Sequence, residues 1–378
     1  MVLQGLDQPD HNLAILEFHQ WIGKARVMGT GDASLDLKYP FVPSSKVQAY
    51  FQDIDNIEKI LAALYGTSEL PVDAQEIKRK YAKVFCILLL IGRGRYIDYF
   101  VRRDSLSDGH LPFDGHPPSF PPSSSTAPNF FEEFCDQQWG FCTPVFEENM
   151  FKGFEEKEIL PIIYKRKLAG GGSATTYQIK LHDEYNLLNS ESKVEGVSWS
   201  PYRSHVQSAY FKQDPDHQYA NTFVLKRYRT QDAEKYFHNE VNAFRKLRNA
   251  GRHSNIIGYH GCFIHNGTYN VILEFADQGT LEQYFARTPP PTRGEDIIAF
   301  WRGILGIIGA LMSIHGIPYC DHDGPQIFQG YETKRSCISL LELPKTNFFQ
   351  LASRREAFEH PDQKLPREIA LLFAIQAR

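Results

Sequence analysis

Apolar residues recur at intervals of three and four along the first hundred residues of the chain. The pattern is regular in HNLAILEFHQWI and in VQAYFQDIDNIEKILAAL, and it predicts amphipathic helices. Ser44 and Ser45 precede the second stretch and are suited to an N-cap. A third stretch, residues 73–100, is also helical in character but contains Gly92 and Gly94. We therefore expect a helical N-terminal domain over residues 1–107.

The helical pattern is lost at residues 108–128, which read DGHLPFDGHPPSFPPSSSTAP. A segment so rich in Pro, Ser and Gly has little apolar surface to bury, so it predicts a flexible linker. Ordered sequence resumes at Asn129, and Trp139 and Phe141 have the character of packing residues. Residues 129–160 are expected to connect the linker to the next domain.

From residue 161 the pattern changes to short stretches that are rich in β-branched and aromatic residues. The predicted order is three strands, a helix, two strands and two helices, which is an α+β fold. The strands are PIIYKRKL, TTYQIKL, NTFVLKRYR, HGCFIHNG and TYNVILEF, and the helices are residues 233–249, TLEQYFART and EDIIAFWRGILGIIGALMSIHG. Residues 182–221 are polar and irregular, and they predict a surface insertion between two strands.

Composition narrows the class of protein. The chain has 378 residues and is 42% hydrophobic, enough for two or three domains of roughly 100–200 residues each. Its net charge of -4 does not favour nucleic acid as a partner. Six cysteines without a CxxC pair predict neither a disulfide scaffold nor a metal site. The N-terminus lacks the order of a signal peptide, and the run VFCILLLIG is too short to span a bilayer. We expect an intracellular protein, cytoplasmic or nuclear, without a membrane partner.

Three consecutive glycines, Gly170, Gly171 and Gly172, lie between the first two predicted strands. Taken alone, consecutive glycines in such a place predict a hairpin turn. Glycine also lets a backbone pass close to a ligand, so the same residues could cover a phosphate. The three residues by themselves leave both interpretations open.

Lys226 ends the apolar stretch FVLK, and a buried ammonium group needs a partner. Glu240 lies in the following predicted helix, beside Val241 at the edge of the apolar face. The two side chains could therefore meet beneath the sheet. In the alternative, they are two unrelated surface charges.

The order of glycine turn, strand Lys, helix Glu and VILEFADQGTL resembles the N-terminal lobe of protein serine/threonine kinases, including kinase-like proteins of filamentous fungi. The resemblance covers about residues 160–316 and implies a mainly antiparallel sheet with one packed helix, followed by the first helices of a truncated second lobe. It implies that Leu168 opens a glycine-rich loop with Gly171 at its centre, and that Lys226 and Glu240 form the ion pair that positions ATP. The loop departs from the family's pattern at Ala169, Ala174 and Thr176.

The resemblance also implies an adenine site in the stretch VILEFADQG. Leu273 would be the gatekeeper residue at the back of this site. The backbone of Glu274 and of Ala276 would form hydrogen bonds with adenine. ATP is thus the implied ligand, and Mg²⁺ is the ion that the family uses with it.

The catalytic loop of the family is not recognisable after this lobe. A direct alignment puts the sequence YCD over His-Arg-Asp, with Asp321 as the base, but places Asp323 and Gln326 where the family has Lys and Asn. In the alternative, GPQIFQG is an inserted loop, and the catalytic-loop motif of the family would be expected directly after it. The chain has YET at that place instead. Beyond Asp323 the only Asp is Asp362, which no Phe-Gly follows. If the tail folds back to supply the missing carboxylate, Asp362 or Glu342 would provide it.

Phosphoryl transfer depends on positioning and on charge neutralisation by Mg²⁺. We therefore expect a truncated kinase-like domain over residues 161–320, a divergent tail over residues 321–378, weak ATP binding and no catalysis. Two alternatives remain open. The chain could be a pseudokinase-like module that binds a protein partner, or a non-functional fragment.

Overall fold

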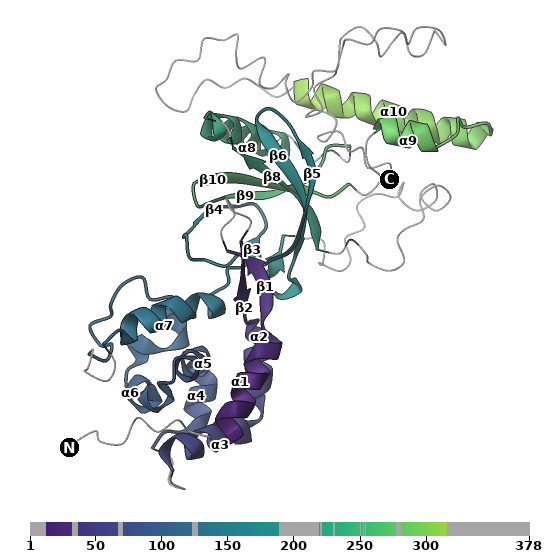
Figure 1. Cartoon of the computed structure of the whole chain (residues 1–378). Helices are drawn as coiled ribbons and strands as arrows, with labels where there is room; N and C mark the ends of the chain where they lie inside the picture. The colour runs from purple at the N-terminus through teal and green to yellow at the C-terminus, as the bar shows by residue number, and fades with distance from the viewer. Residues whose placement is uncertain are drawn as a thin grey trace. The chain divides into compact units, whose positions relative to one another are not determined.

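The computed structural model describes most of residues 13–315. The described ranges are 13–31, 37–66, 71–122, 128–188, 219, 221–229, 231–249, 251, 253, 255–276 and 281–315. The chain divides into two compact units (Figure 1). The first unit comprises Met1–Val145, Glu155–Ile163 and His182–Tyr185, and the second comprises Phe146–Phe154, Tyr164–Leu181 and Asn186–Arg378.

The first unit is mainly helical. Its α-helices are α1 (Leu13–Ala25), α2 (Ser44–Gln52), α3 (Ile54–Tyr65), α4 (Ala74–Lys80), α5 (Ala82–Leu90), α6 (Ile97–Val101) and α7 (Phe130–Gln138), and a hairpin joins β1 (Val27–Thr30) to β2 (Lys38–Phe41). Helix α5 is buried over Val84–Leu89 because it is apolar on every side, as the central helix of a core must be. The other helices turn one apolar face towards this core.

Helix α2 begins differently from the sequence-based expectation. Pro43 is its N-cap residue and makes no side-chain capping bond, whereas Ser44 and Ser45 lie in the first turn. The Glu184 carboxylate accepts hydrogen bonds from the Ser45 backbone N–H at 3.1 Å and from its hydroxyl at 2.6 Å. The free N–H of Ser45 at the start of α2 is thus satisfied by a residue that is 139 positions away.

The prediction of a flexible linker over residues 108–128 is wrong for the part that the structure describes, residues 108–122 and 128. Phe113 and Phe120 are buried in the same core as α5. The buried Gln138 amide accepts a hydrogen bond from the Phe113 N–H at 2.8 Å and donates one to its carbonyl at 3.2 Å. Two aromatic side chains and one amide are enough to dock a segment whose composition is otherwise polar.

The second unit contains a six-stranded sheet with the order β4-β9-β10-β8-β6-β5. These strands are β4 (Met150–Phe154), β5 (Ile162–Gly170, whose first two residues belong to the first unit), β6 (Ala174–Leu181), β8 (Thr222–Tyr228), β9 (Tyr259–His265) and β10 (Thr268–Glu274). The pairs β6–β8, β8–β10 and β10–β9 are antiparallel, which confirms the predicted mainly antiparallel sheet. Strand β4 adds a parallel edge strand beside β9. A short ladder between β3 (Phe146–Glu147) and β7 (Asn186–Leu187) completes the unit.

Strand β4 was not predicted. It lies in the segment expected only to connect domains, and its partner β9 follows more than a hundred residues later. The rings of Phe146, Phe154 and Phe263 lie 5.5–5.7 Å apart and form an aromatic cluster beside this ladder. Gly261 fits its place there because its φ is +150° and a Cβ would come within 3.0 Å of Met150.

One helix packs on the sheet, as predicted. Helix α8 (Ala233–Asn249) lies against β8 and β10 (Figure 1). It buries Phe237, Val241 and Phe244 against side chains of β8, β9 and β10. Helices α9 (Leu281–Arg287) and α10 (Gly294–His315) follow. Much of the predicted insertion at 182–221, and the whole tail from residue 316, lie outside the described residues.

Helix α10 has two unlike faces. Ile307 and Ala310 are buried, and a Cβ at Gly306 would come within 2.7 Å of Asn255 Oδ1, so small residues allow this close packing. A second row of apolar side chains is exposed: Ile298, Trp301, Leu305, Ile308 and Met312. By length and composition alone, Gly294–Ile314 could cross a membrane, a criterion that core helices of soluble proteins also satisfy.

Candidate functional site

The glycine-rich segment forms a hairpin between β5 and β6. The Gly171 N–H donates to the Ala174 carbonyl at 2.9 Å, and the Thr176 hydroxyl donates to the Ala169 carbonyl at 3.3 Å. The predicted hairpin turn is therefore confirmed. Gly170 has no positive φ, and a Cβ there would meet only the Lys167 side chain, at 3.6 Å. The hairpin does not require glycine at this position.

Lys226 and Glu240 meet, as predicted. Strand β8 pairs Lys226 with Thr176 of β6 and with Val271 of β10, so the lysine lies in the middle of the sheet. Its Nζ lies 2.6 Å from Oε2 of Glu240 on α8. The two side chains are only 14% and 9% exposed. The alternative of two unrelated surface charges is thereby excluded.

Tyr228 also bonds to Glu240, a contact that the sequence analysis did not identify. It lies two residues after Lys226 and therefore on the same face of β8. Its hydroxyl donates to Oε2, the same carboxylate oxygen that Lys226 contacts. Burial, and then the neighbouring carboxylate, raise the pKa of Tyr228 well above its usual value, so the hydroxyl remains a donor at neutral pH. The alternation of side chains along a strand could have indicated this neighbour.

The predicted adenine-binding stretch follows β10. Leu273 is buried in one core cluster with Val224 and Val271. The Glu274 N–H donates to the Gly258 carbonyl at 2.8 Å, and the Gly258 N–H donates to the Glu274 carboxylate at 3.0 Å. The backbone N–H of Glu274 is therefore engaged, and a hydrogen bond from adenine to this residue would have to use its carbonyl.

The remaining predicted positions are not tested by this geometry. Asp321, Asp323, Gln326, Glu342 and Asp362 lie outside the described residues. Within residues 13–315 as far as they are described, no group of three or more His, Cys, Asp or Glu side chains could hold a metal ion.

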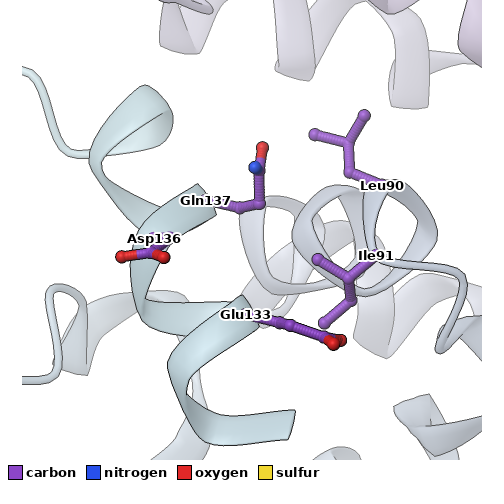
Figure 2. Close-up of a pocket in the computed structure, with 5 residues that line it drawn as sticks. All are labelled: Leu90, Ile91, Glu133, Asp136 and Gln137. Carbon is purple, nitrogen blue, oxygen red and sulfur yellow. The ribbon is translucent and has the colours of Figure 1, made fainter. Parts of the chain in front are cut away.

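A surface pocket of about 410 Å³ lies in the first unit (Figure 2). It is lined by Leu90 and Ile91 at the end of α5 and by Glu133, Asp136 and Gln137 on α7. None of the predicted site residues lines it. The chemistry suggested by the sequence therefore belongs to the sheet and to α8 rather than to this pocket.

Comparison with known proteins agrees with this arrangement. The family model of protein tyrosine and serine/threonine kinase matches residues 202–314. The match includes β8, α8, β9, β10 and α9, and hence Lys226 and Glu240, but begins after the glycine hairpin. No curated protein matches the chain. Residues 202–314, which include the Lys226–Glu240 pair, are therefore similar to the protein kinase family.

Proposed function

We propose that the second unit binds ATP weakly, with Lys226 on the phosphates, and does not transfer the phosphoryl group. The observation that carries this proposal is the 2.6 Å contact between Lys226 Nζ and Glu240 Oε2. An ammonium group has three N–H donors, and the carboxylate uses one. The other two suit phosphate oxygens, and the carboxylate fixes where they point.

Further support comes from the neighbouring elements. Leu168, Gly170, Gly171 and Gly172 form or precede the hairpin turn that ends β5, a place from which backbone N–H groups can approach a phosphate. The adenine contacts are assigned to Glu274 and Ala276 at the end of β10. The phosphates of ATP would be the anion that Lys226 binds. None of the residues that we assign would be a ligand of Mg²⁺.

Phosphoryl transfer requires residues that this chain does not present in recognisable form. Transfer needs a carboxylate that receives the hydroxyl proton and metal ions that neutralise the developing charge. The sequence offers Asp321 for the first role but has Asp323 where a Lys is expected, and it has no Asp-Phe-Gly. Losing metal neutralisation removes several kcal/mol from the stabilisation of the transition state, and each 1.36 kcal/mol is tenfold in rate.

ATP binding is tested by calorimetry on the purified chain. The wild type should bind ATP, and Lys226→Met should reduce the affinity at least about tenfold, because a charge-assisted contact to phosphate is lost. Lys246→Met is the matched control, since Lys246 is an exposed lysine on α8. Equal affinity in the wild type and Lys226→Met would refute the assignment of Lys226.

Transfer is tested separately with radiolabelled ATP and mixed Ser, Thr and Tyr substrates. We expect no signal above background, with or without Mg²⁺. A signal from the wild type that Lys226→Met abolishes would overturn the inactive assignment and restore Asp321 as a base. A cooperative melting transition would separate a folded module from a non-functional fragment.

A second candidate function, a module that binds another protein, is favoured by one observation. The exposed row on α10 includes Leu305 and Met312, which are 61% and 69% exposed. Contiguous exposed apolar side chains commonly mark interaction surfaces. ATP binding and protein binding are compatible in one lobe, so the two candidates need separate tests.

A further inference from the structure

Glu240 is held on one side only. Lys226 Nζ and the Tyr228 hydroxyl both donate to Oε2, whereas Oε1 is buried and has no hydrogen-bond partner. A buried acceptor without a partner is unfavourable, so the second oxygen does not help to hold the carboxylate in place. The orientation of Glu240 depends on two donors that meet at a single atom.

Tyr228 is itself rigidly placed. Its side chain is among the largest fully buried ones, at 2% exposure, and its ring meets that of Phe237 edge to face at 6.2 Å. Phe237 lies on α8, three residues before Glu240 and thus on the same face. Lys226 Nζ also lies 5.3 Å from the centroid of the Tyr228 ring. The tyrosine therefore contacts the helix, the carboxylate and the ammonium group together.

We propose that Tyr228 is a positioning residue that holds the Glu240 carboxylate against Lys226 before any ligand binds. Without its hydroxyl, Oε2 would keep one donor and Oε1 would still have none, so the carboxylate would turn towards solvent for more of the time. Lys226 would then lose its fixed direction. The link from Lys226 to ATP affinity rests on the proposed function, but the geometric claim does not.

The first test therefore needs no nucleotide. Lys226 is acetylated in the native protein with acetic anhydride, which transfers an acetyl group to Nζ and releases acetate. The rate of Lys226 acetylation is measured by peptide mass spectrometry with Lys246 as the internal standard. Tyr228→Phe should raise the Lys226 rate about tenfold, since a hydrogen bond to a charged group is lost. Tyr269→Phe, which removes a hydroxyl from the ring facing Phe237 at 5.1 Å, should leave it unchanged.

A double-mutant cycle separates positioning from a general structural effect. In the Glu240→Ala background, which removes the acceptor of the Tyr228 hydroxyl, Tyr228→Phe should change neither the labelling rate nor the ATP affinity further, whereas a structural role would act in both backgrounds. If Tyr228→Phe does not fold, Tyr228→Met provides a second variant without the hydroxyl. An unchanged Lys226 rate in a folded variant would overturn the proposal. Lack of ATP binding by the wild type would refute only the proposed function, because the labelling test would still decide the role of Tyr228.

Discussion

Asp108 shows how one partly buried carboxylate couples the first unit to pH. Its two oxygens accept the Lys83 and Val84 backbone N–H groups at 2.9 Å each, at the start of α5. Burial raises the pKa of Asp108 from 3.8 to about 6 despite these bonds. The native state therefore holds the proton more tightly than the unfolded chain does. The contribution of Asp108 to stability is greatest below pH 3.8 and is lost as pH rises through about 6.

We expect Asp108→Asn to remove this pH dependence. The shift of about two pKa units corresponds to about 3 kcal/mol. As pH falls from 7 to 4, the free energy of opening α5 should therefore rise by up to that amount in the wild type. The variant should show no such rise. Hydrogen exchange of the α5 amides measures it. Parallel pH profiles in the two proteins would contradict the assignment.

Gly170 allows a second prediction at the residue scale. Because a Cβ fits there without strain, Gly170→Ala should keep the free energy of unfolding within about 1 kcal/mol of the wild type. The same methyl group stands on the hairpin assigned to the phosphates, so ATP affinity should fall. Denaturant titration and calorimetry give the two quantities. A large loss of stability would mean that the turn itself requires glycine.

The elements of the second unit could largely be predicted from the sequence, because their patterns are local. Helix α8 follows from apolar residues at helical spacing, and β8 and β10 from short β-branched runs. The same pattern left the pairing of Lys226 with Glu240 open, and the resemblance to protein kinases implied it. Strand β4 could not be predicted, because a five-residue strand is identified only by a partner distant in sequence. Strand alternation puts Tyr228 on the same face of β8 as Lys226, but only the folded geometry shows that its hydroxyl reaches Glu240.

The docked segment at 108–122 was misjudged for a related reason. The overall composition of the segment is polar, but burial of Phe113 and Phe120 in the helical core is what docks it. Gln138→Ala removes both amide bonds to Phe113 and should cost about 1–3 kcal/mol. Chymotrypsin should then cut after Phe113 faster than in the wild type, whereas Phe120 is not a cleavage site because Pro121 follows it. Gln137→Ala is the control on the same helix, and equal cleavage of both variants would contradict the role of Gln138.

For the whole molecule, we expect the exposed row on α10 to promote self-association. Apolar side chains in contact with water promote self-association at high concentration. Replacing Leu305 and Met312 by Gln should raise the concentration at which the protein remains monodisperse, as measured by light scattering, and should leave ATP affinity unchanged. If association is unaffected, this face does not drive it.

The chain returns to the first unit at residues 155–163 and 182–185 after entering the second, and β4 precedes β9 by about a hundred residues. This interleaving has a consequence for synthesis on the ribosome. At about 5–20 residues per second, β9 is made at least about 5 s after β4. During that interval the apolar Met150 and Phe154 have no partner strand. Protection by chaperones, or rapid synthesis of β9, would keep β4 from pairing with another copy of the chain.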